Sequence, residues 1–358
     1  MPRTGENIYK RKDGRWEARV LVDGEYKSLY ARTYAEVKQK QQAAAAQLLV
    51  AVPAKPQRNL LLERAAADWL TAVRLGVKAS TFGKYERIVR LHISPALGKQ
   101  RLDHITQAQI EQFASGLIAG RLSPKTAQDV LVVTKAILKY AKLAIDFSSI
   151  KIKCEPKEMR VLSKPEQDIL VRCLAENAKN ADATALGVLL ALYTGMRVGE
   201  LCALRWENID LAEKMLYIKS TMQRIPDFDG SEVKTKVAVT SPKSKSSLRA
   251  IPLPDFLVSL LKSAAASPEA FLLSGKSNRF IEPRTMQNRF KACIATWGVA
   301  SANFHCLRHT FATRCVEIGF DAKTLSEILG HSSVNITLGR YVHSSIDLKR
   351  VHMEKLTM

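Results

Sequence analysis

The stretch TGMRVGEL, residues 194–201, decides how the second half of the chain is interpreted, because it is the first of five motifs that follow one another in order. The others are SPKSKSSLRAIPL at 241–253, HCLRH at 305–309, LGHSS at 329–333, and Tyr341, ten residues after the histidine of the fourth motif. One such motif alone is weak evidence, since glycine-rich turns and lone histidines are common. Five in this order over some 150 residues are hard to obtain by chance.

These motifs resemble those of the tyrosine recombinase family, the phage and conjugative-transposon integrases especially. The resemblance implies that Arg197, in the arginine box, and Arg308, in the HxxR box, hold a DNA phosphate. It makes Tyr341 the nucleophile that forms a covalent 3′-phosphotyrosine. It also gives His305 a role in proton handling and His331 a hydrogen bond to the phosphate.

The resemblance places a lysine, the general acid, in the segment 241–253. Lys243 matches the family's position best, and Lys245 is the alternative because one sequence does not fix the register of the hairpin. Glu200 follows the first arginine by three residues, which puts both on one helix face, and it is interpreted as orienting the site. His309 and His343 are interpreted mainly as structural side chains.

The residue types suit this chemistry. A phosphodiester is anionic and gains charge in its transition state, so permanently charged, fork-shaped guanidinium groups should grip its oxygens. A phenol with a reference pKa near 10 needs nearby positive charge and a proton acceptor to become a nucleophile. The leaving 5′ oxygen departs faster when a lysine protonates it. Because the phosphotyrosine keeps the energy of the broken bond, rejoining needs no ATP, and we predict no cofactor and no metal.

The composition indicates a polyanionic partner. Lys and Arg number 55 against 34 Asp and Glu, a net charge of +21, and the basic residues recur in every segment. The six cysteines form no CxxC pair or zinc-ligand spacing, so they are expected to be reduced thiols. No signal peptide or membrane-length apolar run is evident. We therefore expect a protein without membrane contact that acts on double-stranded DNA in the cytoplasm of a bacterial host cell.

Residues 1–52 are predicted to form an arm-type DNA-binding domain. The pairs Asp13-Gly14 and Asp23-Gly24 are hairpin signals and predict a three-stranded meander. Thr33 and Glu36 resemble a capping box that opens a helix. A narrow sheet of this kind fits the major groove. We expect one face of it to carry the DNA-binding residues Lys10, Arg11, Arg15, Arg19 and Lys27.

Residues 60–146 are predicted to form a helical core-binding domain, separated from the meander by a linker with two prolines at 52–59. Breaks are expected at Gly76, Pro95, Gly98 and Gly120. Two basic, hydroxyl-rich helix starts in this domain could follow DNA phosphates. Their candidate DNA-binding residues are Lys78, Thr81, Lys84, Tyr85 and Lys125.

Residues 157–358 are predicted to form a mixed catalytic domain. A helix with proline in its first turn should follow Ser163, and Ala183 to Tyr193 should be a buried helix. Short strands are expected at 215–219 and 248–253 around a polar insertion, with helices from about Pro283. The apolar tail after Tyr341 is, by resemblance, expected to dock on a neighbouring protomer.

The sequence thus predicts a mainly α protein with small β elements in three domains. The resemblance implies integration and excision of a mobile element by a homotetramer that binds core and arm-type attachment sites. An excision factor or a host DNA-bending protein is left open as a further partner. A type IB topoisomerase is the alternative with the same chemistry, and a DNA-binding regulator is the alternative without catalysis.

Overall fold

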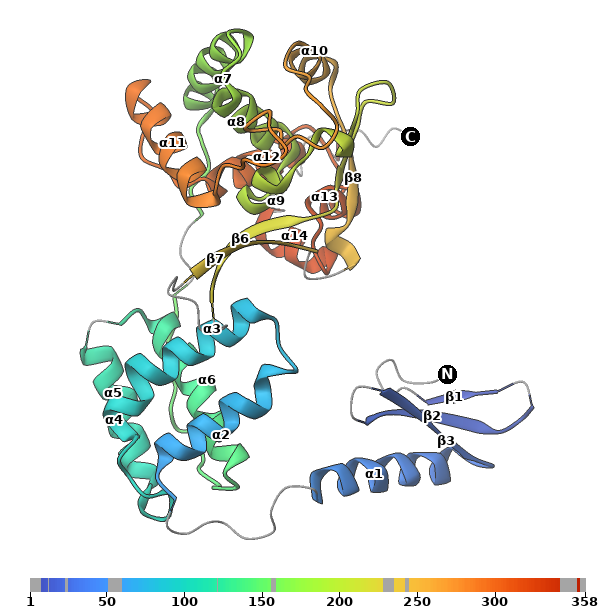
Figure 1. Ribbon diagram of the computed structural model, residues 1–358, viewed down its shortest axis with the longest axis vertical. Helices are drawn as coiled ribbons and strands as arrows, with labels where there is room; N and C mark the ends of the chain where they lie inside the picture. The colour runs from blue at the N-terminus through green and yellow to red at the C-terminus, as the bar shows by residue number, and fades with distance from the viewer. Residues whose placement is uncertain are drawn as a thin grey trace. The chain divides into compact units, whose positions relative to one another are not determined.

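The computed structural model describes residues 8–11, 13–22, 25–50, 60–120, 122–155, 159–227, 235–241, 245–341 and 353–354 (Figure 1). The chain divides into two compact units, Met1–Cys154 and Glu155–Met358. The linker predicted at 52–59 lies outside the described residues. In the part of the chain that is described, no helix is long and apolar enough to cross a membrane.

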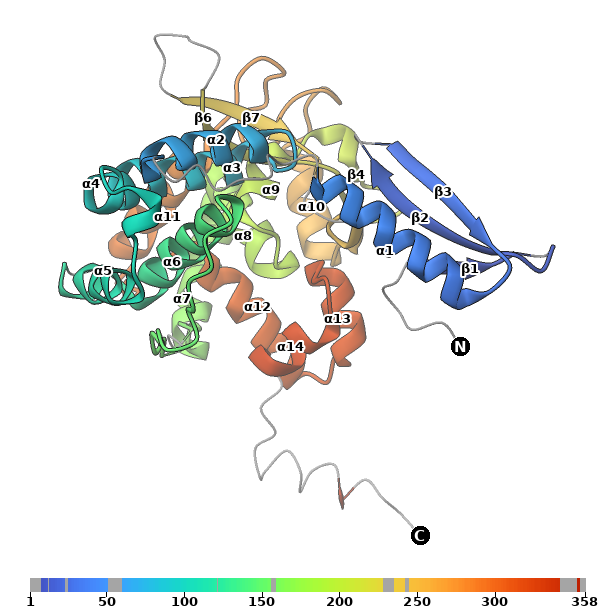
Figure 2. The same cartoon turned by 90° about the horizontal axis from the view of Figure 1, so that it is seen from below.

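The first unit begins with the predicted three-stranded meander. Strands β1 (Ile8–Lys10), β2 (Trp16–Val22) and β3 (Glu25–Ala31) pair antiparallel in the order β1-β2-β3. Helix α1 (Tyr34–Val50) lies along one face of this sheet (Figure 2). The Thr33 hydroxyl accepts a hydrogen bond from the backbone N–H of Glu36 at 3.3 Å, as the predicted cap requires. The small core beneath the helix consists of Ile8, Ala18, Ala31 and Val37.

The register of the sheet corrects the predicted DNA-binding face. Ala18, on β2, is fully buried against α1. Successive residues of a strand alternate between the two faces of a sheet, so every second residue of β2 from Ala18 faces the helix. Lys10 pairs with Trp16 and Lys27 pairs with Val20, both in the same alternating set as Ala18. The five basic residues therefore do not share one face, because Lys10 occupies a helix-side position while Arg19 belongs to the open face.

Helices make up the rest of the first unit. They are α2 (Leu62–Arg74), α3 (Ala79–Ile88), α4 (Ser94–Leu97), α5 (Gln107–Ala119) and α6 (Pro124–Tyr140). Their apolar faces meet in a core that includes Leu62, Trp69, Ile110 and Ile137. The capping box of α5, and the Ser123 cap and proline start of α6, fix where these helices begin.

The predicted break at Pro95 is wrong. A π-helical turn, Val89–Ile93, joins α3 directly to α4, so the chain stays helical through Leu97. Pro95 stands in the first turn of α4, next to the wider π turn. A missing N–H costs little where helical hydrogen bonding changes register. The run ends before Gly98, as expected.

The second unit is built around the buried helix α8 (Ala183–Thr194), as predicted. Helix α7 (Lys164–Lys179) starts with the expected proline and with a capping box between Ser163 and Glu166. The other helices are α9 (Val198–Ala203), α10 (Asp255–Ser263), α11 (Pro283–Thr296), α12 (His305–Glu317), α13 (Ala322–Leu329) and α14 (Val334–Tyr341). The core continues from α8 into α9, α11 and the start of α12.

Two small sheets complete the second unit. Strands β4 (Ile209–Asp210), β5 (Met215–Ile218) and β8 (Arg249–Pro252) pair antiparallel, and β5 with β8 confirms the predicted pair. The segment expected as a polar insertion instead contains a hairpin, β6 (Thr221–Pro226) and β7 (Thr235–Thr240) (Figure 1). Its strands carry mixed polar residues and are only partly buried, so apolar alternation was a weak signal.

Candidate active site

The arginine box forms the turn between α8 and α9. Helix α8 ends at Gly195, whose φ of +63° lies in the left-handed region that favours glycine. A Cβ at this position would come within 2.5 Å of a ring carbon of Phe311, on α12. The turn therefore needs glycine both for its conformation and for its close approach to α12.

Arg308, on α12, is the buried cation of the site. Only 2% of its surface is exposed, and its Nη1 donates to the backbone oxygen of Gly195 at 2.8 Å. Its Nη2 is buried and has no hydrogen-bond partner among the described residues. Burial, followed by the positive charge of Arg197, lowers the pKa of Arg308 to about 9, which still leaves it charged at neutral pH. An unpartnered buried donor is costly, and an anionic ligand oxygen would satisfy it.

Glu200 connects the arginine box to strand β8. Its carboxylate, 3% exposed, accepts from the backbone N–H of Arg197 at 2.9 Å and from Arg197 Nη1 at 2.7 Å. Arg249 donates to the same carboxylate at 2.9 and 3.2 Å. Burial alone would raise the pKa of Glu200, but the hydrogen bonds and charge of Arg249, with the charge of Arg197, make the net shift downward. Glu200 is therefore an anion held between two guanidinium groups.

The predicted geometry of Arg197 and Glu200 needs a correction. Arg197 is the extended residue that precedes α9, and Glu200 stands in the first turn of that helix. The two do not share a helix face; the contact arises because the carboxylate folds back to cap the helix start.

Arg249 was not assigned a role from the sequence, yet it joins three elements. Besides Glu200, its Nε donates to the backbone oxygen of Ile328 at 2.5 Å, and its Nη1 donates to that of Ser247 at 3.3 Å. Its side chain is 5% exposed. Ile328 belongs to the last turn of α13, two residues before Gly330 and three before the motif histidine His331. One buried side chain thus links β8, α9 and the third histidine box.

Tyr341, the last described residue of α14, is 7% exposed. His331, in the turn after α13, stacks with its ring at 6.4 Å between centroids, and His331 Nδ1 lies 2.8 Å from the Thr337 hydroxyl. Burial raises the pKa of Tyr341, while the charges of Arg308 and Arg340 oppose the rise. The phenol is therefore protonated at neutral pH in the chain without DNA.

The α12 histidines lie beside this tyrosine. His309 Nδ1 is 2.8 Å from the Tyr341 hydroxyl oxygen, and the rings of His305 and His309 meet edge to face at 4.6 Å. Burial lowers the pKa of His305 to about 4, and the charges of His309 and Arg308 contribute to the same shift. The interpretation of His309 as mainly structural missed its contact with the predicted nucleophile.

The structure thus brings Arg197, Arg308, His305, His331 and Tyr341 into one neighbourhood of the second unit. Lys243 lies outside the described residues. Lys245 begins a short 3₁₀ turn, Lys245–Ser247, that leads into β8, but its side chain also lies outside the described part. His343 is likewise not described.

Two of the candidate DNA-binding residues of the helical region contact Asp129, on α6. Lys84, on α3, lies 2.8 Å from its carboxylate, and Lys125, one turn earlier on α6, lies at 3.4 Å. Lys78 precedes α3 and is exposed. Thr81 is partly buried in the first turn of α3. Tyr85 packs against Trp69 at 5.3 Å between ring centroids, so it is mainly a core contact.

The arginines of the meander form a second group. Arg11 Nη1 and Arg19 Nε each donate to Glu17 at 3.0 Å, and the Ser28 hydroxyl donates to it at 2.8 Å. Arg15 pairs with Asp13 at 2.8 Å. These carboxylates hold the arginines in place on the outer side of the sheet.

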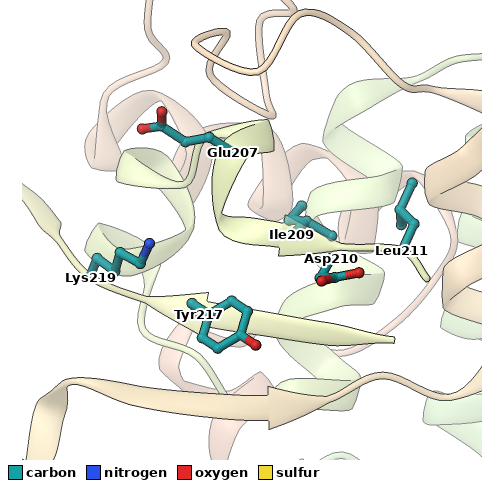
Figure 3. Close-up of a pocket in the computed structure, with 6 residues that line it drawn as sticks. All are labelled: Glu207, Ile209, Asp210, Leu211, Tyr217 and Lys219. Carbon is teal, nitrogen blue, oxygen red and sulfur yellow. The ribbon is translucent and has the colours of Figure 1, made fainter. Parts of the chain in front are cut away.

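A cavity of about 500 Å³ opens elsewhere in the second unit, along β4 and β5 (Figure 3). None of the predicted catalytic residues that the structure describes lines it. Its lining residues are Glu207, Ile209, Asp210, Leu211, Tyr217 and Lys219.

Comparison with known proteins finds a family match in each of the two units. Residues 160–347 match the phage integrase family, and residues 62–118 match the N-terminal SAM-like domain of phage integrases. A XerC-like tyrosine recombinase of Caldanaerobacter subterraneus subsp. tengcongensis is 29% identical over 305 residues, which covers 77% of each protein. An integrase of Saccharopolyspora erythraea is 23% identical over 348 residues, 79% of this chain and 78% of the relative.

Solved structures share the fold. The Tn1549 transposon integrase in complex with circular intermediate DNA covers 83% of this chain and 100% of its own, with a TM-score of 0.67 and 20% identity. A lambda integrase tetramer bound to a Holliday junction covers 97% of this chain and 99% of its own, with a TM-score of 0.56 and 17% identity.

Proposed function

Because the chain belongs to the phage integrase family and is a DNA-binding tyrosine recombinase, we propose that it integrates and excises a mobile element through a 3′-phosphotyrosine at Tyr341. The main support is the environment of the Tyr341 hydroxyl. It lies in a buried cluster with His309 and Arg308. The Nη2 of Arg308, which has no hydrogen-bond partner among the described residues, offers a donor to a phosphate oxygen. Type IB topoisomerases use the same chemistry, but the SAM-like domain and the relatives favour an integrase.

In the proposed mechanism, Arg197 and Arg308 bind the non-bridging oxygens of the scissile phosphate and stabilise the charge that develops there. Glu200 and Arg249 hold Arg197 at the start of α9. His331 donates a hydrogen bond to the phosphate. Lys243, with Lys245 as the alternative, protonates the leaving 5′ oxygen. The phosphotyrosine then stores the bond energy for rejoining.

DNA binding is proposed to divide among three parts, residues 1–52, 60–146 and 157–358. In the helical part, Lys84 and Lys125 are exposed and are brought together by Asp129, so they can contact adjacent phosphates of a core site. Lys78 and Thr81 extend this surface along the start of α3. Tyr85 is left out, since it packs in the core.

The meander is proposed to bind arm-type sites through Arg11, Arg15 and Arg19, the arginines held on its outer side. A tether between two DNA-binding parts would raise the local concentration of the second site after the first is bound. We further propose a homotetramer as the active assembly, because the lambda integrase with this fold is a tetramer on a Holliday junction. The tail after Tyr341, proposed to dock on a neighbouring protomer, lies mostly outside the described residues.

The proposal is tested by sequencing the DNA that flanks the gene and building a linear substrate with the two candidate element ends. We expect wild-type protein to release a circle and join the flanks, detected by sequencing across both junctions. Tyr341→Phe should give neither product. Relaxation of plasmids without either end, with no new junctions, would contradict the proposal and favour a topoisomerase.

A further inference from the structure

The predicted nucleophile already has a proton-acceptor contact. His309 Nδ1 lies 2.8 Å from the hydroxyl oxygen of Tyr341, and both side chains are buried. This distance is that of a good hydrogen bond between a phenol and an imidazole nitrogen. Arg308 also lies near the phenol, but a guanidinium has no acceptor and cannot take up its proton.

The other two histidines of the site are engaged differently. His331 Nδ1 lies 2.8 Å from the Thr337 hydroxyl, and the ring of His331 stacks on that of Tyr341. His305, for which the family resemblance implies a role in proton handling, meets the ring of His309 edge to face. Within the described part of the chain, the hydrogen bond between a histidine and the Tyr341 hydroxyl is the one made by His309.

The protonation states allow a proton transfer in this direction, although both pKa shifts make the transfer less favourable. Burial lowers the pKa of His309, and the positive charges of Arg340 and Arg308 lower it further. The imidazole of His309 is therefore neutral at neutral pH. Burial raises the pKa of Tyr341, so its phenol is protonated. The groups that face His309 are therefore two cations, the neutral His305 and a phenol that must lose its proton.

We propose that His309 is a catalytic residue that accepts the proton of Tyr341 during DNA cleavage. The proposal rests on the proposed function. As the bond between the Tyr341 oxygen and phosphorus forms, the phenolic proton moves to His309 Nδ1. The bond from phosphorus to the 5′ oxygen breaks, and that oxygen takes a proton from the lysine segment. In rejoining, His309 returns its proton to the departing tyrosine, so one residue serves both directions.

The first test is single-turnover cleavage of a nicked core-site duplex by His309→Asn. Asparagine keeps a polar group near the Nδ1 position but cannot take up a proton. We expect cleavage at neutral pH to slow by about 10²–10⁴-fold, the usual range for a general base. The rate of the variant should keep rising with pH toward the pKa of the phenol. His104→Gln, a histidine in the first unit, should stay close to wild type.

The second test uses the intact histidine and fluorotyrosines of lower phenol pKa at position 341. If His309 is the acceptor, the acid limb of the pH–rate profile belongs to the histidine and stays in place. A limb that moves with the phenol pKa would overturn the proposal, even if His309→Asn does not fold. Wild-type rate and pH profile in His309→Asn would also overturn it. Failure of the wild-type protein to form any adduct would instead refute the proposed function.

Discussion

Arg249→Met should destabilise the second unit by about 3 kcal/mol. The substitution removes the hydrogen bonds to Glu200, Ile328 and Ser247 and leaves a buried carboxylate with less compensation. Removing one partner of a buried ion pair typically costs about 3–5 kcal/mol. The lower end applies because Arg197 still donates to Glu200 at 2.7 Å.

The matched control is Arg224→Met. Arg224 also donates to a carboxylate, that of Glu282, but the two side chains are 47% and 28% exposed. Pairs of this kind contribute up to about 1 kcal/mol, so the control should lose no more than that. The two variants share the residue type, the substitution and the unit. They differ in burial and in the backbone carbonyls that Arg249 also bonds.

Urea titration of the full chain, followed by hydrogen exchange in peptides from α9, β8 and α13, reports the second unit separately. The double variant Glu200→Gln with Arg249→Met should be more stable than the sum of the single losses predicts, by roughly 1–3 kcal/mol, since no buried charge is left unpaired. The linking role of Arg249 would be refuted if the losses in the free energy of unfolding are additive. It would also be refuted if Arg249→Met is as stable as Arg224→Met.

Three further predictions concern the lysine general acid, the DNA contacts of the meander and the pH dependence of stability. Lys243→Ala should slow the cleavage of ordinary DNA severely. The rate of this variant should recover on a substrate with a 5′-bridging sulfur, because that leaving group needs no proton. Rescue of Lys245→Ala instead would assign the acid role to Lys245. Glu17→Gln should weaken footprints outside the crossover site while core-site protection stays, because it releases Arg11 and Arg19 of the meander. Equal loss at both sites would contradict this. Burial lowers the pKa of His331 from 6.5 to about 4, so the unfolded chain binds more protons between these values. Thermal melts should show stability falling by roughly 1–2 kcal/mol as pH drops through this window, less so in His331→Gln; no difference between the two would contradict it.

Local signals in the sequence predicted much of the fold. The Asp-Gly pairs, the Ser163 cap and the apolar run of α8 each act within a few residues of themselves, so one sequence suffices. The hairpin β6–β7 lacked clear alternation because it is only partly buried. Helix α10 was missed although Leu257, Val258 and Leu261 are buried at helical spacing, a signal that could have found it.

The site was predicted from the order of the motifs. The residues that this prediction missed act through contacts between segments that are far apart in the sequence. Nothing near Arg249 in the sequence indicates that its side chain reaches the carbonyl of Ile328, 79 residues later. The contact of His309 with Tyr341 also depends on how α12 and α14 pack. Spacing on a single helix predicts neither, so both roles came from the structure.

Mass spectrometry of the trapped DNA complex tests the central claim most directly. After cleavage of a nicked core-site duplex, the covalent complex is treated with nuclease to trim the DNA and with protease to cut the protein. The peptide that carries the nucleotide remnant is then sequenced. We predict the remnant on Tyr341, joined through a 3′ phosphate, and no adduct with Tyr341→Phe. A remnant on any other residue, or an adduct that survives in the phenylalanine variant, would contradict the account.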